Sequence, residues 1–203
     1  MHRCGVYSED IIMKEMQEKI LKDGKVISGG ILKVGSFLNQ QIDIDFLKRM
    51  GQEIARLYAD EKVDKILTIE ASGISIAVAA GMELGVPVVF AKKHLTSNVD
   101  GAFYSANVHS YTRDEDYSVV VSIDFLSPGE RVLLVDDFLA NGQALNGLLS
   151  LVKQAGAEAV GVAVAIEKCF QGGGDEIRER GIRVEALVAI ESMSSEGIIF
   201  RSN

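Results

Sequence analysis

Two adjacent carboxylates and a short run of small residues are the part of this sequence whose chemistry is easiest to read. Asp136 and Asp137 directly follow the apolar run Val132–Val135, and the small-residue segment Ala140–Ala144 comes shortly afterwards. Carboxylate oxygens accept hydrogen bonds from a vicinal diol such as that of a ribose. Backbone N–H groups that open a helix favour an anion, and small residues let a phosphate approach the main chain. A phosphorylated sugar fits both halves of the stretch.

The elements around this stretch must present it at the edge of a sheet. The run Val132–Val135 has no polar alternation, which is typical of a central parallel strand covered on both faces. After Ala144, apolar residues recur at helical spacing until Gly156. The acids therefore fall near the carboxyl end of a strand, where α/β sheets bind ligands. The alternative is that the acids only begin a turn and that Gly142 only gives flexibility.

This stretch resembles the diphosphoribosyl-binding signature of type I phosphoribosyltransferases. The resemblance implies that Asp136 and Asp137 are the catalytic acids, which hold the ribose hydroxyls of phosphoribosyl diphosphate. It implies that the 5-phosphate is bound by Ala140, Asn141, Gly142, Gln143 and Ala144. Mg²⁺ is implied with the diphosphate, and no direct protein ligand to the metal is predicted. Ala140 departs from the pattern of the hypoxanthine and guanine enzymes, which carry an aspartate there, so no general base is assigned at that position.

A second strand-to-helix turn follows the predicted strand Lys65–Ile69. Alone, a Ser-Gly turn such as that in Glu70–Ser75 is typical of an ordinary turn. The resemblance implies that this turn binds the diphosphate through Ala71, Ser72 and Gly73, with an unusual backbone at the pair Ala71–Ser72. Two lysines, Lys92 and Lys93, leave the next strand at its carboxyl end. The resemblance implies that they reach the diphosphate, in some relatives across a dimer interface, and the alternative is an ordinary solvated cluster.

The base would lie beside a further strand end. Lys168 follows the predicted strand Ala159–Ile166 and should project into the crevice beside the sugar site. The resemblance implies that Lys168 donates to the 6-oxo group of a purine. It also implies that Leu32 and Asn39, in a hood similar to that of the bacterial members that use xanthine, touch the base. The alternatives are an ion pair between Lys168 and Glu167 and an ordinary loop in place of the hood.

Two connections are predicted from composition. A polar excursion between Leu95 and Tyr117 is a candidate lid that would keep water from the reaction centre, with Ala102–Thr112 and Tyr117–Ile123 pairing as a hairpin. The glycine-rich segment Gln171–Gly174 lacks the order of a P-loop, and we expect it to be a flexible link before a short helix capped by Asp175.

Composition restricts the class of protein. The chain has 203 residues, of which 47% are hydrophobic and 25% charged, which suits one compact domain. Its net charge of −8 argues against a nucleic-acid surface. No apolar run approaches the length of a membrane span, so no membrane partner is expected. Cys4 and Cys169 cannot form a disulfide framework, which predicts a cytoplasmic setting.

The predicted fold class is α/β, a doubly wound and mainly parallel sheet with a small N-terminal hood at about residues 25–43. Asp43 should cap the helix that follows the hood. Residues 13–203 are predicted to form a single phosphoribosyltransferase domain, and residues 1–12, which show no periodicity, are predicted to be an N-terminal extension. Segments 184–190 and 198–200 should supply closing strands.

The resemblance implies a purine-salvage reaction in a homodimer: phosphoribosyl transfer from phosphoribosyl diphosphate to xanthine, giving xanthosine 5′-phosphate and diphosphate. Other bases stay open, namely guanine, hypoxanthine and adenine, although a lysine donor suits an oxo group better than an amine. The alternative from another class is a non-catalytic regulator that senses phosphoribosyl diphosphate. Such a regulator would need a surface for DNA or RNA, which the acidic balance disfavours.

Overall fold

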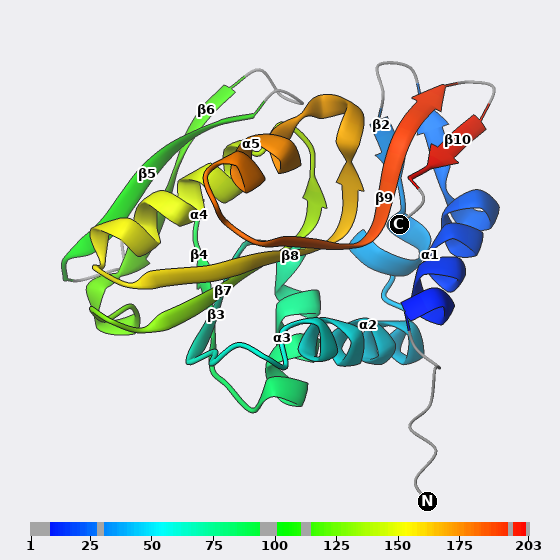
Figure 1. Ribbon diagram of the computed structural model, residues 1–203. Helices are drawn as coiled ribbons and strands as arrows, with labels where there is room; N and C mark the ends of the chain where they lie inside the picture. The colour runs from blue at the N-terminus through cyan, green and yellow to red at the C-terminus, as the bar shows by residue number, and fades with distance from the viewer. Residues whose placement is uncertain (1–8, 28–30, 94–100, 111–114, 195–196, 202–203) are drawn as a thin grey trace, which may run out of the picture.

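The computed structural model describes residues 9–27, 31–93, 101–110, 115–194 and 197–201. Its central feature is a six-stranded sheet with the order β10-β9-β8-β7-β3-β4 (Figure 1). The strands are β3 (Lys65–Ile69), β4 (Val88–Ala91), β7 (Arg131–Leu139), β8 (Glu158–Lys168), β9 (Val184–Ser194) and β10 (Gly197–Phe200). All are parallel except β10, which runs antiparallel to β9. The predicted mainly parallel α/β sheet is confirmed.

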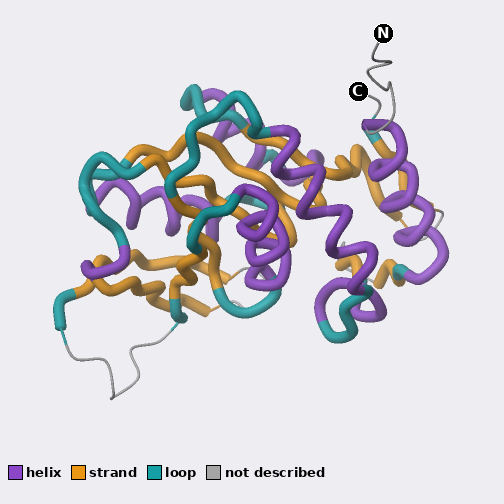
Figure 2. The backbone as a smooth tube through the Cα atoms, turned by 90° about the horizontal axis from the view of Figure 1, so that it is seen from below, coloured by secondary structure: helices purple, strands orange, loops and turns teal. Residues whose placement is uncertain are grey.

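Helices cover both faces of this sheet (Figures 1 and 2). On one face lie α2 (Ile44–Leu57) and α3 (Gly73–Leu84), and on the other lie α4 (Gln143–Gln154) and α5 (Gly173–Glu179). The side chains of successive β7 residues point to opposite faces of the sheet. Leu133 packs in the core beneath α2 and α3, whereas Leu134 packs in the core beneath α4. Burial on both sides explains why this strand shows no polar alternation.

The segment 25–43 forms a small unit beside the sheet. It contains β1 (Lys25–Ile27), which pairs antiparallel with β2 (Ile31–Lys33), and a π-helical turn over Gly35–Asn39. Before it runs α1 (Glu9–Asp23). Because α1 begins at Glu9 and Ile12 is buried in the core, the end of the predicted extension 1–12 is helical, while residues 1–8 lie outside the described part of the chain.

The predicted hairpin is present as β5 (Phe103–Ser110) and β6 (Glu115–Ser122). It packs on α4 so closely that a Cβ added to Gly147 would lie 2.5 Å from Cγ2 of Val108. Lys92 and Val120 exchange two backbone hydrogen bonds of 3.0 and 2.9 Å, which join the hairpin to the end of β4. Residues 94–100 and 111–114, which belong to the predicted lid, lie outside the described residues.

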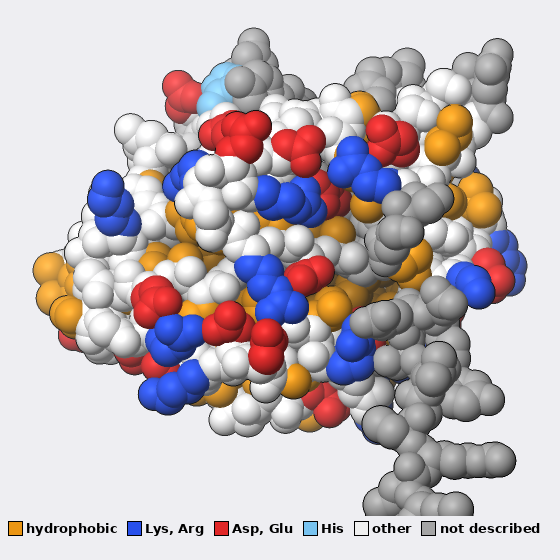
Figure 3. Space-filling model, viewed as in Figure 1, with side chains coloured by type: hydrophobic (Ala, Val, Ile, Leu, Met, Phe, Trp, Pro, Cys, Tyr) orange, Lys and Arg blue, Asp and Glu red, His pale blue; other side chains and the backbone are white. Residues whose placement is uncertain are grey.

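Basic and acidic side chains are interspersed on the face shown in Figure 3. Among the described residues, no helix is both long and apolar enough to cross a membrane.

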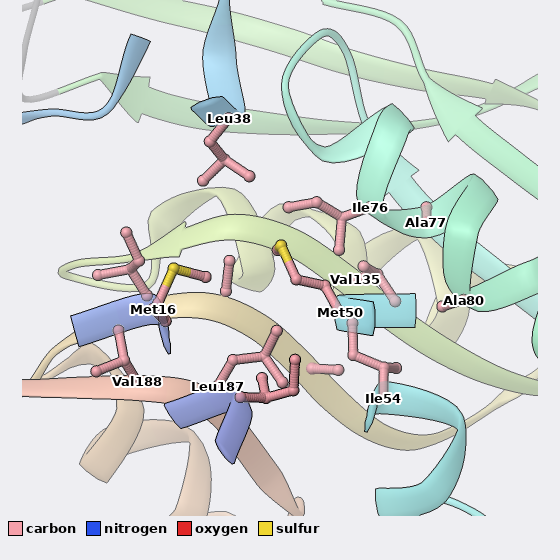
Figure 4. Close-up of a cluster of buried hydrophobic side chains, with 14 of the residues drawn as sticks. Met16, Leu38, Met50, Ile54, Ile76, Ala77, Ala80, Val135, Leu187 and Val188 are labelled. Carbon is pink, nitrogen blue, oxygen red and sulfur yellow. The ribbon is translucent and has the colours of Figure 1, made fainter. Parts of the chain in front are cut away.

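The core ties the hood to the sheet. Figure 4 shows Met16 of α1, Leu38 of the π-helical turn, Met50 of α2 and Val135 of β7, and these side chains belong to one buried cluster. At the start of α2, the backbone N–H of Phe46 donates to the Asp43 side chain at 3.0 Å, as expected for an N-cap. The hood is therefore held by the same core that supports the strand with the acidic pair.

Candidate active site

The acidic pair lies near the carboxyl end of β7, between β3 and β8. The strand continues to Leu139, so the acids lie in its carboxyl-terminal half, near the strand end as the sequence predicted. Asp136 is 5% exposed and Asp137 is half-buried. Oδ1 of Asp136 accepts a hydrogen bond of 2.9 Å from the N–H of Asp137, and Oδ1 of Asp137 accepts one of 3.0 Å from the N–H of Phe138. These bonds fix the orientation of both carboxyl groups.

The two acids differ in their electrostatic surroundings. Burial, followed by the negative charge of Asp137, raises the pKa of Asp136 well above its ordinary value. The N–H of Asp137 and the charge of Lys93 act in the opposite direction. Asp136 therefore holds a proton more readily than an ordinary aspartate does. Asp137 is half-buried, and its carboxyl group accepts a hydrogen bond from Asn39 of the hood.

Residues 140–142 join β7 to α4, and Gln143 and Ala144 form the start of that helix, which confirms the predicted strand, small-residue turn and helix. Gly142 has a φ of 76° and precedes the first residue of α4. This left-handed conformation favours glycine. The first N–H groups of a helix have no partner within it, so the N–H groups at this loop are suited to a phosphate.

The glycine segment predicted to be a flexible link packs against this loop. The N–H of Gly173 donates to the carbonyl of Ala140 at 3.1 Å, and a Cβ added to Gly173 would lie 2.4 Å from the N atom of Gly142. The flexible-link prediction is therefore wrong: glycine is required because two backbones meet. The predicted cap is also wrong, since α5 begins at Gly173 with Gly172 as its N-cap.

The loop after β3 contains a cis peptide bond between Glu70 and Ala71. The sequence placed the unusual backbone at the pair Ala71–Ser72, one residue too late. Gly73 begins α3, and a Cβ there would lie 2.3 Å from Oγ1 of Thr68 and 2.9 Å from Oδ1 of Asp136. The loop that starts α3 is thus in contact with the buried acid of β7.

The two lysines after β4 differ in position. The N–H of Lys93 donates to Oε1 of Glu70 at 2.7 Å, and Nζ of Lys93 lies 5.3 Å from the centroid of the Tyr117 ring. Its charge also acts on Asp136, so Lys93 belongs to the surroundings of the acidic pair. Lys92 is exposed and lines an apolar groove beside β4.

Lys168 is the last residue of β8, the strand next to β7. Its Nζ lies 5.4 Å from the centroid of the Phe138 ring, and partial burial lowers its pKa. The alternative partner Glu167 pairs instead with Arg178, through hydrogen bonds of 2.7 and 2.6 Å. The structure therefore places the Lys168 ammonium beside the residue that follows the acidic pair.

Asn39 and Leu32, the two hood residues expected to touch the base, lie in different surroundings. Nδ2 of Asn39 donates to Oδ2 of Asp137 at 2.9 Å, so the hood reaches the acidic pair directly. Leu32 is 5% exposed and packs in the core cluster with Met16 and Leu38. The structure therefore brings Asn39 to the acids and places Leu32 in the support of the hood.

The carboxylates of this site fit a Mg²⁺ ion that is held together with phosphate groups. Among the described residues, no group of three or more His, Cys, Asp and Glu side chains could hold a metal by itself. Mg²⁺ usually keeps several waters and is bound by one or two carboxylates together with substrate phosphates. Asp136 and Asp137, beside two loops suited to anions, match that donor set.

Sequence reasoning missed three contributors. Thr68 is fully buried, and its hydroxyl has no hydrogen-bond partner among the described residues. Gly173 and the Glu167–Arg178 pair were also overlooked. A threonine within the apolar strand Lys65–Ile69 was the available signal for the first. For Gly173 and the Glu167–Arg178 pair, the available sequence feature was the glycine run that lies between Glu167 and Arg178.

Comparisons with known proteins agree with this geometry. The phosphoribosyl transferase domain family model matches residues 34–182, which contain both loops and the acidic pair. The chain therefore belongs to the phosphoribosyltransferase family. 

Two curated relatives are similar over most of their length. The xanthine phosphoribosyltransferase of Brevibacillus brevis is 52% identical over 93% of this chain and 96% of its own. Xanthine phosphoribosyltransferase 1 of Clostridium perfringens is 52% identical over 93% of this chain and 100% of its own. 

Among solved structures, the adenine phosphoribosyltransferase of Thermoanaerobacter pseudethanolicus has a TM-score of 0.74 at 20% identity, covering 87% of this chain and 99% of that one. This likeness confirms the fold.

Proposed function

We propose that this enzyme transfers the 5-phosphoribosyl group from phosphoribosyl diphosphate to xanthine, giving xanthosine 5′-phosphate and diphosphate in purine salvage. The observation that carries the proposal is the meeting of an acidic pair, a phosphate-binding loop and Lys168 at the carboxyl ends of β7 and β8. Relatives about half identical to this chain are xanthine phosphoribosyltransferases.

The sugar phosphate is held by backbone and acid together. N–H groups of Ala140–Ala144 bind the 5-phosphate, since the start of α4 favours an anion. Asp136 and Asp137 accept hydrogen bonds from the ribose hydroxyls. These carboxyl groups orient the ring while positive charge develops at the anomeric carbon, and the nearby negative charge favours that transition state.

The base is held between β8 and the hood. Lys168 donates to the 6-oxo group of xanthine, and its positive charge favours the anionic form of the base. An anionic purine nitrogen can attack the anomeric carbon without a separate proton acceptor, which fits Ala140 at a position where some relatives carry an aspartate. Leu32 and Asn39 shape the hood side of the base site.

The diphosphate leaves on the side of the β3 loop. Ala71, Ser72 and Gly73 supply backbone groups at the start of α3, and Lys93, beside Glu70 and Asp136, adds positive charge. When bound with the substrate, Mg²⁺ would offset the charge that develops on the leaving group.

A second copy of this chain completes the site in the proposed assembly. Phe90, Ile123 and Phe125 are 41%, 42% and 56% exposed. Phe90 belongs to β4, the edge strand of the sheet, and Ile123 and Phe125 belong to the short turn after β6. Phe90, Phe125 and Lys92 line a groove of about 370 Å³. An exposed apolar patch at a sheet edge is typical of a protein interface. A homodimer through this surface would carry Lys92 to the diphosphate of either copy, and sedimentation of the full chain at twice its mass would support it.

Location and domain extent belong to the same proposal. Cys169 is a free, buried thiol, as expected of a cytoplasmic protein. Residues 13–203 would form one catalytic domain with a hood at about 25–43, and residues 1–12 would be an extension joined within α1. The proposed partners are phosphoribosyl diphosphate, xanthine and a second copy, with no nucleic acid and no membrane, and the net charge of −8 argues against a nucleic-acid surface.

A purine panel tests the proposed function. Xanthine, guanine, hypoxanthine and adenine are each supplied with phosphoribosyl diphosphate and Mg²⁺, and nucleotide formation is followed. We expect xanthine to have the highest kcat/KM and adenine the lowest, because a lysine donor does not pair with an exocyclic amine. An enzyme inert toward every oxopurine, or one that prefers adenine, would contradict the proposal.

Lys168→Ala refines this test. It should raise the KM for xanthine by about 10- to 100-fold, the usual worth of a hydrogen bond from a charged group, and change the KM for phosphoribosyl diphosphate much less. Lys153→Ala, an exposed lysine of α4, is the control. Equal losses for both substrates would count against the assigned role of Lys168.

A further inference from the structure

The glycine run after β8 connects the base side of the site to the phosphate loop. Gly173 donates its N–H to the carbonyl of Ala140 at 3.1 Å, and it lies so close to Gly142 that neither chain could shift toward the other. Gly173 is also the first residue of α5. The position of the phosphate loop therefore depends on where the start of α5 is held.

A buried ion pair holds the start of α5. Glu167 is 2% exposed, and both of its carboxylate oxygens accept hydrogen bonds from Arg178, at 2.7 and 2.6 Å. Gly174 fits against this pair only because it has no side chain, since a Cβ there would lie 1.9 Å from Oε1 of Glu167. A buried carboxylate needs such a partner, and a bidentate guanidinium also fixes direction.

The same pair lies next to the base site. Glu167 immediately precedes Lys168 in β8, and in the parallel pairing it is opposite Leu139, the residue before the phosphate loop. A further contact joins the end of α5 to α4, where Nη1 of Arg180 donates to Oδ1 of Asn146 at 2.6 Å. One short helix thus contacts β8, the phosphate loop and the helix that follows the loop.

We propose that Glu167 and Arg178 are positioning residues of the transfer reaction: through α5 and Gly173 their ion pair sets the phosphate loop at a fixed distance from Lys168. The inference rests on the proposed function, because that function assigns the loop to the 5-phosphate and Lys168 to the base. Neither side chain touches substrate. Their effect is on the separation of the two binding sites, to which phosphoribosyl transfer is sensitive because small misplacements of reacting groups slow a reaction strongly.

Arg178→Lys is the first test, since it keeps the charge and removes the two-pronged geometry. We expect the KM for phosphoribosyl diphosphate to rise by about tenfold, with a smaller change in the KM for xanthine. Amides of residues 140–145 should exchange hydrogen faster, while the core strands exchange as in the parent protein. 

Arg183→Lys is the matched control. Arg183 lines the same cavity of about 420 Å³ as Arg178 and is also paired with carboxylates, those of Glu185 and Asp60, yet it lies just before β9. It should leave both KM values and the loop amides unchanged.

Gly173→Ala keeps the test decisive if Arg178→Lys does not fold. It leaves the ion pair intact and disturbs only the contact with the loop, so it should reproduce the rise in KM and the faster exchange of residues 140–145. Parent-like KM and exchange in a folded Arg178→Lys, or in Gly173→Ala, would overturn the proposal.

Calorimetry with phosphoribosyl diphosphate and Mg²⁺ needs no purine, so it separates a failure of the proposed function from a failure of the positioning proposal. A parent protein that binds this donor but ignores xanthine would disprove the substrate assignment. The variants would still test the positioning of the loop by their donor affinity.

Discussion

The loops after β7 and β3 share one plan and differ in what supports them. Each follows a buried parallel strand and opens a helix, α4 in the first case and α3 in the second. The β7 loop turns at Gly142 with a positive φ and rests on the backbone of Gly173. The β3 loop contains a cis peptide bond, and its Gly73 rests on the side chains of Thr68 and Asp136.

This difference suits two chemical tasks. The β7 loop is supported by backbone groups, which do not ionise, and this fits a phosphate that stays unchanged through the reaction. A loop supported by Thr68 and Asp136 lies beside a buried acid whose charge depends on its surroundings. That arrangement fits the group that leaves, since its charge changes during the transfer.

Gly73→Ala should break the β3 loop and have the largest effect. The new Cβ would fall 2.3 Å from Oγ1 of Thr68 and 2.9 Å from Oδ1 of Asp136, so the loop and the acid must both move. We expect kcat/KM to fall by about 100-fold or more, as measured by steady-state kinetics. Gly35→Ala, whose Cβ would meet only ordinary contacts from 3.6 Å outward, is the control. Activity within threefold of the parent enzyme would show that the support of Gly73 is not critical.

Gly142→Ala should weaken the β7 loop less. Alanine in the left-handed region costs about 1–2 kcal/mol, and its Cβ would lie 3.4 Å from Gly173. The KM for phosphoribosyl diphosphate should rise by roughly tenfold, the factor that about 1.4 kcal/mol represents, with kcat reduced less. 

Gly85→Ala separates backbone cost from site effect. Gly85 has a similar φ of 69°, with nothing within 4 Å of an added Cβ, and ends α3 away from the loops. It should lose comparable stability and keep its KM. If both variants showed the same kinetics, the loop conformation would carry no special role in phosphate binding.

Asp136→Asn tests the charge that distinguishes the two loops. The native state raises the pKa of Asp136, so it binds the proton more tightly than the unfolded chain does. Parent stability should therefore fall as pH rises above the ordinary value of 3.8. Asp136→Asn does not lose stability in this way. The Tm of the variant minus that of the parent should therefore be smallest below that pH and grow above it, by about 2–4 °C for each kcal/mol in a chain of this size. Activity should fall, because a ribose ligand is lost.

Thermal unfolding across pH measures this effect, and Asp60→Asn supplies a control of opposite sign. A hydrogen bond from Arg183 lowers the pKa of Asp60, so its contribution to stability is present above the unfolded pKa and is lost as pH falls. Asp60→Asn should therefore lower Tm at neutral pH and have no effect in acid. An Asp136→Asn curve parallel to that of Asp60→Asn would contradict the buried-acid interpretation.

Local signals in the sequence predicted the β7 site and much of the sheet. Val132–Val135 is fully buried, as its unbroken apolar run indicated, and the loop and helix after the acids follow as expected. Asp43 caps α2, and the β5–β6 hairpin forms at the two segments that were predicted to pair. These features depend on spacing along a few neighbouring residues, which a sequence displays directly.

Tertiary contacts account for what could not be predicted. A glycine run read locally indicates flexibility, whereas Gly173 and Gly174 are glycines because Gly142 and Glu167 approach them from other elements. No proline marks the cis bond at Glu70–Ala71. Glu167 pairs with Arg178 of the next helix and not with its neighbour Lys168, because the two side chains of adjacent strand residues point to opposite faces of the sheet.

Asn39→Ala should have the smallest effect. It tests whether the hood acts on the β7 site alone or also on the β3 loop. Nδ2 of Asn39 donates to Asp137 at 2.9 Å in an exposed position. Loss of such a bond is worth about 0.5–1.5 kcal/mol, so kcat/KM should fall by roughly 2- to 12-fold. Gln41→Ala, an exposed hood residue, is the control. 

Substrate dependence locates the effect of Asn39→Ala. If Asn39 acts through the acid of the β7 site, the KM for phosphoribosyl diphosphate should change together with that for xanthine. A change confined to xanthine would mean that Asn39 leaves Asp137 when the sugar hydroxyls bind there and then contacts only the base. In either case the β3 loop should be unaffected, since Asn39 contacts Asp137, whereas Gly73 lies against Asp136. Weaker inhibition by diphosphate alone in this variant would contradict the separation of the two loops.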